Sequence, residues 1–310
     1  MSKIAIIGFH NLHLMQFLYK YTNILDENNI EYDVLYWNRD GIEYSQKFRG
    51  NEVRFNYITS NYVSKWKKLH GYLKCRKFFI KTIKKNKYDK LILLTTQTAV
   101  ALSTVVLKRY KNSYIYDYRD MTMENVFIYK AIVEKLVKYS YITAISSKGF
   151  IPFINNKDKI NAAKFVMAHN CRNLKCKPYK IKKCSPIKIV FWGMVRQLEY
   201  QKKICDFFGN DDRFEIQYHG EGATEDLAAY CLKRAYKNIE FTGRYFPEEI
   251  PLFVENTDIL MNLYENDGKQ EHALTVKFYD GIQYGLPMLV MKNSYMDSYI
   301  GEKMFKYSFS

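Results

Sequence analysis

The sequence predicts an α/β protein with two doubly wound halves, each a parallel sheet covered by helices. Short apolar runs alternate with amphipathic stretches of helical period along most of the chain. A polar, basic stretch with two prolines, residues 171–186, interrupts this alternation once, and the alternation then starts again. The length of 310 residues is enough for two domains. We therefore expect domains at 1–172 and 187–310, joined by a linker at 173–186.

The individual elements follow from periodicity. Parallel strands buried on both faces are continuously apolar, whereas the covering helices carry an apolar stripe with a period of 3.6 residues. The uncharged stretch 91–107 is nearly long enough to span a membrane, but its threonine, serine and glutamine side chains favour a strand followed by a helix. No transmembrane segment is therefore expected. The expected strands are 3–7, 32–37, 90–95, 113–116, 141–145, 165–167, 187–192, 214–219, 240–242, 259–263 and 288–291, and the expected helices are 12–28, 64–86, 97–109, 124–139, 147–155, 199–208, 223–237, 247–255 and 275–284.

The positive charge of the chain is concentrated in its first half. Residues 1–175 hold 30 lysines and arginines against 13 acidic residues, whereas residues 176–310 hold 18 against 19. This asymmetry indicates an anionic partner, and nucleic acid, anionic lipid and phosphorylated substrates all fit that description.

The six cysteines lack C-x-x-C spacing. A zinc site at Cys171, Cys176 and Cys184 is therefore disfavoured, and free thiols in a reducing cytoplasm are expected.

Several nucleotide-binding motifs are missing. The turn after the first strand, residues 8–11, has one glycine instead of the G-x-G-x-x-G that a dinucleotide requires. The P-loop pattern G-x-x-x-x-G-K-[ST] and the nucleophile pattern G-x-S-x-G do not occur. We therefore expect neither NAD or FAD in the first half nor a P-loop ATPase.

The segment 273–290 is the most informative part of the second half. Thr275 is placed to cap a helix, Lys277 adds a cation to its positive end, and Asp280 follows one turn later. Such a helix start suits a diphosphate, and the carboxylate suits ribose hydroxyls. The alternative is an N-capped surface helix with an i,i+3 Lys–Asp pair.

Three strand ends of the second half also carry glycine, at Gly193, at Gly220 with Gly222, and at Gly243. Glycine allows a ligand to approach the backbone closely, although for any single position an ordinary strand-to-helix turn glycine is the preferred interpretation.

Together these motifs resemble a known family. The matching stretches are 189–193 with Arg196, 219–222, 241–245, 247–250, 258–262 and 277–287. They resemble the donor-binding domain of GT-B glycosyltransferases of the family 4 type, which build bacterial capsule and exopolysaccharide. The resemblance spans about residues 187–292, and it extends to the first half loosely through 117–120 and 145–147. It implies two Rossmann-like domains that face a cleft.

The resemblance implies a donor site for a nucleotide sugar such as a UDP-sugar, without a required metal ion. Gly193 and Arg196 would face the diphosphate, and Thr275, Val276 and Lys277 would bind the phosphates through backbone and side chain. Cations and helix dipoles would stabilise the leaving diphosphate.

The remaining donor residues would hold the nucleoside. Gly220 and Gly222 would pass near the nucleotide, Arg244 and Tyr245 would line the base pocket, and Asp280 would hold the ribose.

The sequence departs from the family pattern in two places. The first glutamate of the family's Glu-x7-Glu would fall on His272, with Glu271 beside it. GT-B chains usually continue through another strand and a returning helix, whereas this chain stops at Ser310, so we expect a shortened C-terminal part.

The acceptor is expected on the first half. His10 lies in the first strand-to-helix turn and is a candidate general base, with a helix-entry histidine as the alternative. Asp117, Arg119 and Asp120 follow a strand and are candidate acceptor-site or catalytic residues, with a structural Arg–Asp network as the alternative. A retaining reaction would need no dedicated base.

Residues 62–90 form a basic amphipathic segment with eleven lysines and arginines against Asp89. This pattern suits an anionic membrane surface, here the inner face of the cell membrane, where a lipid-linked glycan acceptor would be found. The alternative is a solvated helix whose apolar face belongs to the core.

The preferred function is glycosyl transfer to a lipid-linked or glycan acceptor in surface polysaccharide synthesis. A non-catalytic GT-B-like partner subunit is the alternative, supported by His272 and the early end of the chain. RNA binding is disfavoured because no RNP, KH or zinc signature is present.

Overall fold

The computed structural model of the chain consists of two compact units, Met1–His169 and Asn170–Ser310. It describes residues 3–15, 17–43, 48–59, 65–155, 160–171, 185–301 and 306–309. Most of the expected linker, residues 173–184, lies outside the described residues, as do Cys176 and Cys184. The exact domain limits expected at 172 and 187 therefore stay a prediction.

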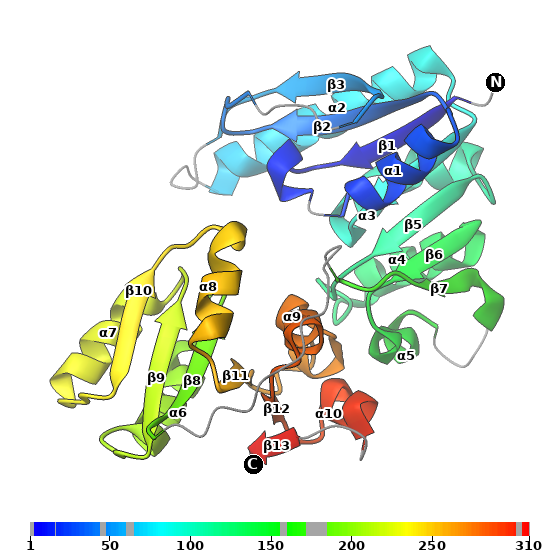
Figure 1. The fold of residues 1–310 in the computed structure, drawn as a ribbon. Helices are drawn as coiled ribbons and strands as arrows, with labels where there is room; N and C mark the ends of the chain where they lie inside the picture. Colours follow the sequence, from blue (N-terminus) through cyan, green and yellow to red (C-terminus); the bar gives the residue numbers. More distant parts are fainter. Residues whose placement is uncertain are drawn as a thin grey trace. The chain divides into compact units, whose positions relative to one another are not determined.

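The first unit contains a seven-stranded parallel sheet in the order β3-β2-β1-β4-β5-β6-β7 (Figure 1). The chain starts in the middle, moves outward to β3 and returns to β4 beside β1. In open α/β sheets this reversal is where ligands bind, at the carboxyl ends of the strands. The strands are β1 Ile4–Gly8, β2 Tyr32–Asn38, β3 Asn51–Asn56, β4 Lys90–Leu94, β5 Tyr114–Tyr118, β6 Ile142–Ile145 and β7 Phe165–Met167; the helices are α1 Tyr19–Glu27, α2 Lys65–Asn86, α3 Thr96–Arg109, α4 Phe127–Tyr139 and α5 Ile151–Ile154.

The second unit contains a six-stranded parallel sheet in the order β10-β9-β8-β11-β12-β13. Alternate side chains of β8 enter two different cores. Ile189 and Phe191 pack with α6 and α7, whereas Val190 and Trp192 pack with α9 and α10. The strands are β8 Ile187–Trp192, β9 Phe214–His219, β10 Ile239–Gly243, β11 Ile259–Asn262, β12 Met288–Met291 and β13 Lys306–Phe309; the helices are α6 Leu198–Phe208, α7 Thr224–Lys233, α8 Ile250–Glu255, α9 Val276–Tyr284 and α10 Tyr295–Ile300.

The expected α/β class with two parallel sheets is confirmed, and every expected strand is present within two residues of its predicted ends. The stretch 91–107 forms most of β4 and α3, and no helix among the described residues is long and apolar enough to cross a membrane. The helix expected over 12–28 is shorter, because a 3-10 turn at Leu12–Leu14 precedes α1. The strand β3 was not expected, since it is a half-exposed edge strand with the mixed sequence NEVRFN.

Candidate functional site

The residues expected to bind the donor all lie at the carboxyl edge of the second sheet. Gly193 directly follows β8, Gly220 follows β9, Arg244 follows β10, and α9 begins after the loop that follows β11. Because all strands of this sheet run parallel, their carboxyl ends meet at one edge. The tertiary structure therefore brings together residues that are distant in sequence.

Glycine is required in these turns on different structural grounds. Gly220 has a φ of +152°, and a Cβ there would lie 1.7 Å from the carbonyl oxygen of Gly193. A Cβ at Gly222 would lie 2.3 Å from the oxygen of Val195. Both glycines are thus required because two turns of the protein approach each other closely.

Gly193 differs from the other two. Its φ is +130°, and the one described atom within 4 Å of an added Cβ is the Lys277 Nζ, at 3.8 Å. The turn after β8 therefore opens toward the side chain of Lys277, on the first turn of α9.

Lys277 is buried, with 5% of its surface exposed. Its Nζ has no hydrogen-bond partner among the described residues. Instead it lies 3.4 Å from the ring centroid of Phe191 and 4.7 Å from that of Tyr264. Burial lowers the pKa of Lys277 well below its usual value, and nearby Arg196 lowers it further, while Asp280 opposes the shift. Because Lys277 and Asp280 are both buried, the alternative of a surface helix with an i,i+3 Lys–Asp pair is wrong.

The start of α9 is capped as the sequence predicts. The Thr275 Oγ1 accepts a hydrogen bond from the Phe278 N–H at 3.1 Å. The same hydroxyl donates to Asn262 Oδ1 at 3.0 Å, which ties the helix to the end of β11. These two hydrogen bonds of the Thr275 hydroxyl fix the start of α9, where the first backbone N–H groups have no partner within the helix.

Asp280 is also buried, with 2% of its surface exposed. Its Oδ2 accepts a hydrogen bond from the indole N–H of Trp192 at 3.0 Å. Trp192 is the last residue of β8, so this bond fixes the carboxylate just behind the Gly193 turn. No sequence pattern had indicated a role for Trp192.

Two further side chains surround Lys277. Arg196 is exposed and acts electrostatically on both Lys277 and Tyr264. Burial raises the pKa of the Tyr264 hydroxyl, while Arg196 opposes that shift. No sequence pattern indicates a role for Tyr264, because an aromatic residue after a strand gives no distinctive signal.

The expected base pocket residues lie after β10. Arg244 pairs with Glu221 at 3.3 Å, and both side chains are mostly exposed, so the pair contributes about 0–1 kcal/mol. Tyr245 packs edge-on against Phe253, with ring centroids 5.4 Å apart.

His219 is a further polar residue of this edge, and no sequence pattern assigns it a role. Its ring stacks on Phe253 at 3.8 Å, and its Nδ1 lies 2.6 Å from the Thr242 hydroxyl. Its Nε2 is buried and has no hydrogen-bond partner in the described part of the chain. Burial lowers its pKa, so the ring is neutral at pH 7.

The position where the family pattern has a glutamate is occupied by a paired histidine. His272 Nε2 lies 2.9 Å from Glu271 Oε1, and each side chain is 26% exposed. The pair lies in the 3-10 turn Gln270–His272, shortly before α9. A carboxylate is thus present next to the expected position, one residue earlier in the chain.

The acceptor-side candidates lie at the carboxyl edge of the first sheet. His10 follows β1, and burial together with the nearby Arg39 cation lowers its pKa below 6.5. The loop that carries it is held to the loop after β2, since Asn11 accepts a hydrogen bond from the Arg39 N–H at 2.6 Å and donates one to Asp40 at 2.8 Å.

Asp117 and Arg119 form a buried ion pair, with 2.7 Å between Oδ1 and Nε. Arg119 also donates to the Ala168 carbonyl at 2.5 Å and lies over the Phe17 ring at 4.4 Å. Burial raises the pKa of Asp117, and Arg119 opposes the shift. Asp120 is exposed. This geometry agrees with the Arg–Asp network that the sequence left open as the alternative.

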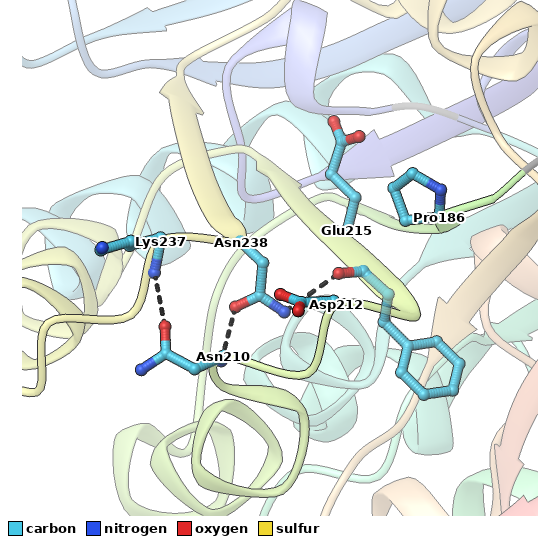
Figure 2. Close-up of a pocket in the computed structure, with 7 residues that line it drawn as sticks. Pro186, Asn210, Asp212, Glu215, Lys237 and Asn238 are labelled. Carbon is cyan, nitrogen blue, oxygen red and sulfur yellow. Dashed lines mark hydrogen bonds between the residues drawn. The ribbon is translucent and has the colours of Figure 1, made fainter.

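A pocket at the opposite edge of the second sheet is shown in Figure 2. It lies where β8, β9 and β10 begin, far along the strands from Gly193. Its polar groups bind one another: the Asn210 N–H donates to Asn238 at 2.8 Å, and the Lys237 N–H donates to Asn210 at 3.0 Å. Its polar groups therefore stabilise the loops.

In the described part of the chain, no three His, Cys, Asp or Glu side chains are grouped so that they could hold a metal ion. Among the cysteines that the structure describes, Cys75, Cys205 and Cys231 are buried free thiols.

No protein-family profile matches the sequence, and no curated protein matches it. Solved structures do match. Sucrose-phosphate synthase from Thermosynechococcus elongatus gives a TM-score of 0.73 at 11% identity, over 99% of this chain and 86% of the other. HepE from Anabaena, in complex with UDP and glucose, gives 0.68 at 11% identity, over 100% and 86%.

The lipopolysaccharide outer core galactosyltransferase WaaB gives 0.61 at 14% identity, over 94% of this chain and 80% of the other. The chain has the GT-B fold. The expected GT-B class is thereby confirmed, whereas identities of 11 to 14% bear on the fold alone. The second unit, Asn170–Ser310, contains all of the residues that are expected from the sequence to bind the donor.

Proposed function

We propose that the protein transfers a sugar from a nucleoside-diphosphate sugar to an acceptor. The observation that carries the proposal is the buried Lys277 Nζ beside the Gly193 turn, without a hydrogen-bond partner among the described residues. A buried cation without such partners is costly, so its presence at a helix start fits an anionic ligand that supplies them. The GT-B fold supports the proposal, since HepE in complex with UDP and glucose shares it.

The chemistry requires stabilisation of the leaving diphosphate. When the bond between the anomeric carbon and the diphosphate breaks, negative charge grows on the β-phosphate oxygen. We assign Lys277, Arg196 and the first N–H groups of α9, at Val276 and Lys277, to that charge. Thr275 and Gly193 keep the backbone in place and leave room for the phosphates. In this proposal the protein's own cations make a metal ion unnecessary.

The nucleoside is assigned to the residues around the same edge. Asp280 would hold the ribose, because a carboxylate can accept from an indole and from a hydroxyl at the same time. Arg244 and Tyr245 would line the base, and Gly220 and Gly222 would pass near the nucleotide. His219 adds a buried ring nitrogen at this edge that a nucleotide group could satisfy.

On the acceptor side, we assign the general base to His10. Its lowered pKa keeps the imidazole neutral and able to accept a proton at pH 7. Asp117 and Arg119 would position the loop through their buried ion pair, and Asp120, which is exposed, would contact the acceptor.

We further propose that the acceptor is a lipid-linked glycan at the cytoplasmic face of the cell membrane, in the synthesis of a bacterial surface polysaccharide by a family 4 type enzyme. The basic α2 supports this placement, because it contains no acidic residue and its lysines would lie against anionic lipid. Replacing Lys81, Lys84 and Lys85 by glutamine is expected to release the protein from anionic vesicles. Unchanged binding would contradict the placement.

The donor proposal is tested by isothermal titration with UDP, GDP and dTDP, followed by donor hydrolysis with the matching sugar nucleotide. Binding of at least one diphosphate, weakened by Lys277→Ala and unchanged by Lys233→Ala on the exposed end of α7, is the expected result. Failure of all three diphosphates to bind would refute it.

A second candidate is a non-catalytic partner subunit that retains the fold. It is favoured by His272, which occupies the position of a family carboxylate and is paired with Glu271. Such a subunit would bind a diphosphate without hydrolysing or transferring any sugar, so the hydrolysis assay distinguishes the two candidates.

A further inference from the structure

Two groups of large apolar side chains are exposed on the first unit. On α2, Trp66 is 81% exposed, and Leu69 and Leu73 follow at helical spacing with 48% and 47%. At the start of α4, Phe127 and Ile128 are 83% and 72% exposed. The two groups together are named the apolar edge, which consists of Trp66, Leu69, Leu73, Met123, Val126, Phe127 and Ile128.

The two groups lie at the same end of neighbouring helices. α2 packs against α3, and α3 packs against α4 (Figure 1). The Tyr72 hydroxyl of α2 donates to the Gln97 carbonyl at the start of α3 at 3.0 Å. Burial and the nearby Tyr129 of α4 raise the pKa of Tyr72. Helices that follow parallel strands begin at the carboxyl edge of the sheet, so the apolar edge lies at the end that carries Asp117 and His10.

The exposed residues of α4 are presented by a firmly held loop. The buried Glu124 accepts hydrogen bonds from the Tyr118 hydroxyl at 2.8 Å and from the Thr122 N–H. The Val126 N–H donates to the Met123 carbonyl at 2.9 Å. The residues on either side of Glu124 therefore point outward because the loop is anchored, and their exposure is part of the fold.

Positive charge borders the apolar edge. Beyond Leu73, the same face of α2 continues with Lys77, Lys81 and Lys84, which are exposed. α2 contains no acidic residue to neutralise them. An apolar tip followed by lysines is the pattern of a helix that lies in the interface of an anionic membrane. A second copy of this chain would bring like charges together at this surface.

We propose that the apolar edge inserts into an anionic phospholipid bilayer while Lys77, Lys81 and Lys84 lie against the headgroups. Insertion adds a hydrophobic contribution to the electrostatic docking and fixes the orientation of the first unit. Met123 follows Asp120 by three residues, so the insertion places the carboxyl edge of β5 at the membrane surface. This consequence for a lipid-linked acceptor rests on the proposed function, whereas the insertion itself is measured without nucleotide.

The chain carries its own probe for the test. Of its three tryptophans, Trp37 and Trp192 are each 1% exposed, and Trp66 is the exposed one. Adding vesicles of phosphatidylcholine and phosphatidylglycerol at 7:3 should shift the tryptophan emission to the blue, and Trp66→Phe should abolish the shift. Phe127→Ser with Ile128→Ser should weaken vesicle partitioning by at least about tenfold, because each large apolar side chain kept from water contributes a factor of that order.

Leu232→Ser is the matched control, because Leu232 is 82% exposed on α7 of the second unit and should leave partitioning unchanged. Thermal melting and UDP titration of the same variants should match the wild type, which separates this inference from donor binding. Absence of vesicle binding would overturn the proposal. Binding that leaves the Trp66 emission unshifted, and that persists in the Phe127→Ser, Ile128→Ser variant, would also overturn it. The proposal would also be overturned if the wild type formed a dimer in the absence of vesicles and the Phe127→Ser, Ile128→Ser variant were a monomer.

Discussion

Replacing Lys277 by methionine tests the centre of the proposed donor site, because the change removes the charge and keeps an unbranched apolar side chain. Lys277 is 5% exposed, and its Nζ lies 3.4 Å from the Phe191 ring centroid without a hydrogen-bond partner among the described residues. The expected result is a protein that binds nucleoside diphosphates less well and whose free energy of unfolding stays close to that of the wild type.

The two magnitudes follow from the surroundings of the ammonium group. Replacing buried ionic groups by packed apolar side chains is often neutral or stabilising by about 1–4 kcal/mol. The variant also loses the cation–π contact with Phe191, which lowers the gain in stability by about 2 kcal/mol. We therefore expect the free energy of unfolding to change by at most about 2 kcal/mol in either direction. A hydrogen bond to a charged group contributes about 1.5–3 kcal/mol, so UDP should bind about 10- to 100-fold more weakly.

The stability of the wild type should also depend on pH through this residue. Burial lowers the pKa of Lys277 in the folded state well below 10.5, whereas the unfolded chain keeps the usual value. Between these two values the unfolded state binds more protons, so the free energy of unfolding rises with pH there. Lys277→Met should lack this part of the pH dependence.

Urea unfolding at several pH values gives the stabilities, and titration calorimetry with UDP and uridine gives the affinities. Uridine lacks the phosphates, so its affinity should change little. Lys233→Met, on the exposed end of α7, is the control for the loss of one charge. A Lys277→Met protein that binds UDP as the wild type does, or that is several kcal/mol less stable, would refute the reasoning.

Three further predictions concern single residues. Gly220→Ala should lower the free energy of unfolding by about 3 kcal/mol or more, because the new Cβ would clash with a carbonyl oxygen. Gly243→Ala, where no described atom lies within 4 Å of the new Cβ, should cost about 1–3 kcal/mol from backbone strain alone. Equal losses of the two variants in urea unfolding would contradict this. Asp280→Ala should weaken the binding of UDP more than the binding of inorganic diphosphate. It should also lower the free energy of unfolding by about 1–3 kcal/mol, because the Trp192 N–H is left unsatisfied. An unchanged UDP affinity would contradict a contact between Asp280 and the ribose. His10→Ala should lower turnover about 100-fold without changing UDP affinity, and wild-type turnover should rise with pH through a pKa below 6.5; normal turnover would exclude His10 as the base.

The strands could be predicted because burial on both faces leaves a simple trace in the sequence. β1 and β2 are buried at every residue, and both were found within one residue of their ends. β3 lacks that trace, because an edge strand is covered on fewer sides and tolerates Asn51, Glu52 and Arg54. The helix α10 was not predicted for a different reason: with six residues it is too short to show a helical period.

Within the proposed donor site, the sequence identified the cap at Thr275 and the cation at Lys277, since both depend on local order along one helix. It placed Gly220 and Gly222 near the nucleotide, which stays a prediction, and only the structure shows that both glycines allow two turns of the protein to touch. Trp192, His219 and Tyr264 were missed, because their significance comes from partners far away in the chain.

The sequence by itself determined the alternation of strands and helices, the two halves and the basic character of the first, because these depend on composition and on short-range periodicity. Only the tertiary structure decided that Lys277 is buried beneath the Gly193 turn, that Asp117 is paired with Arg119, and that exposed apolar residues of α2 and α4 share one edge. The physical reason is that burial and pairing depend on which strands become neighbours. Strand order is fixed by contacts between residues that are distant in sequence, and no local pattern records them.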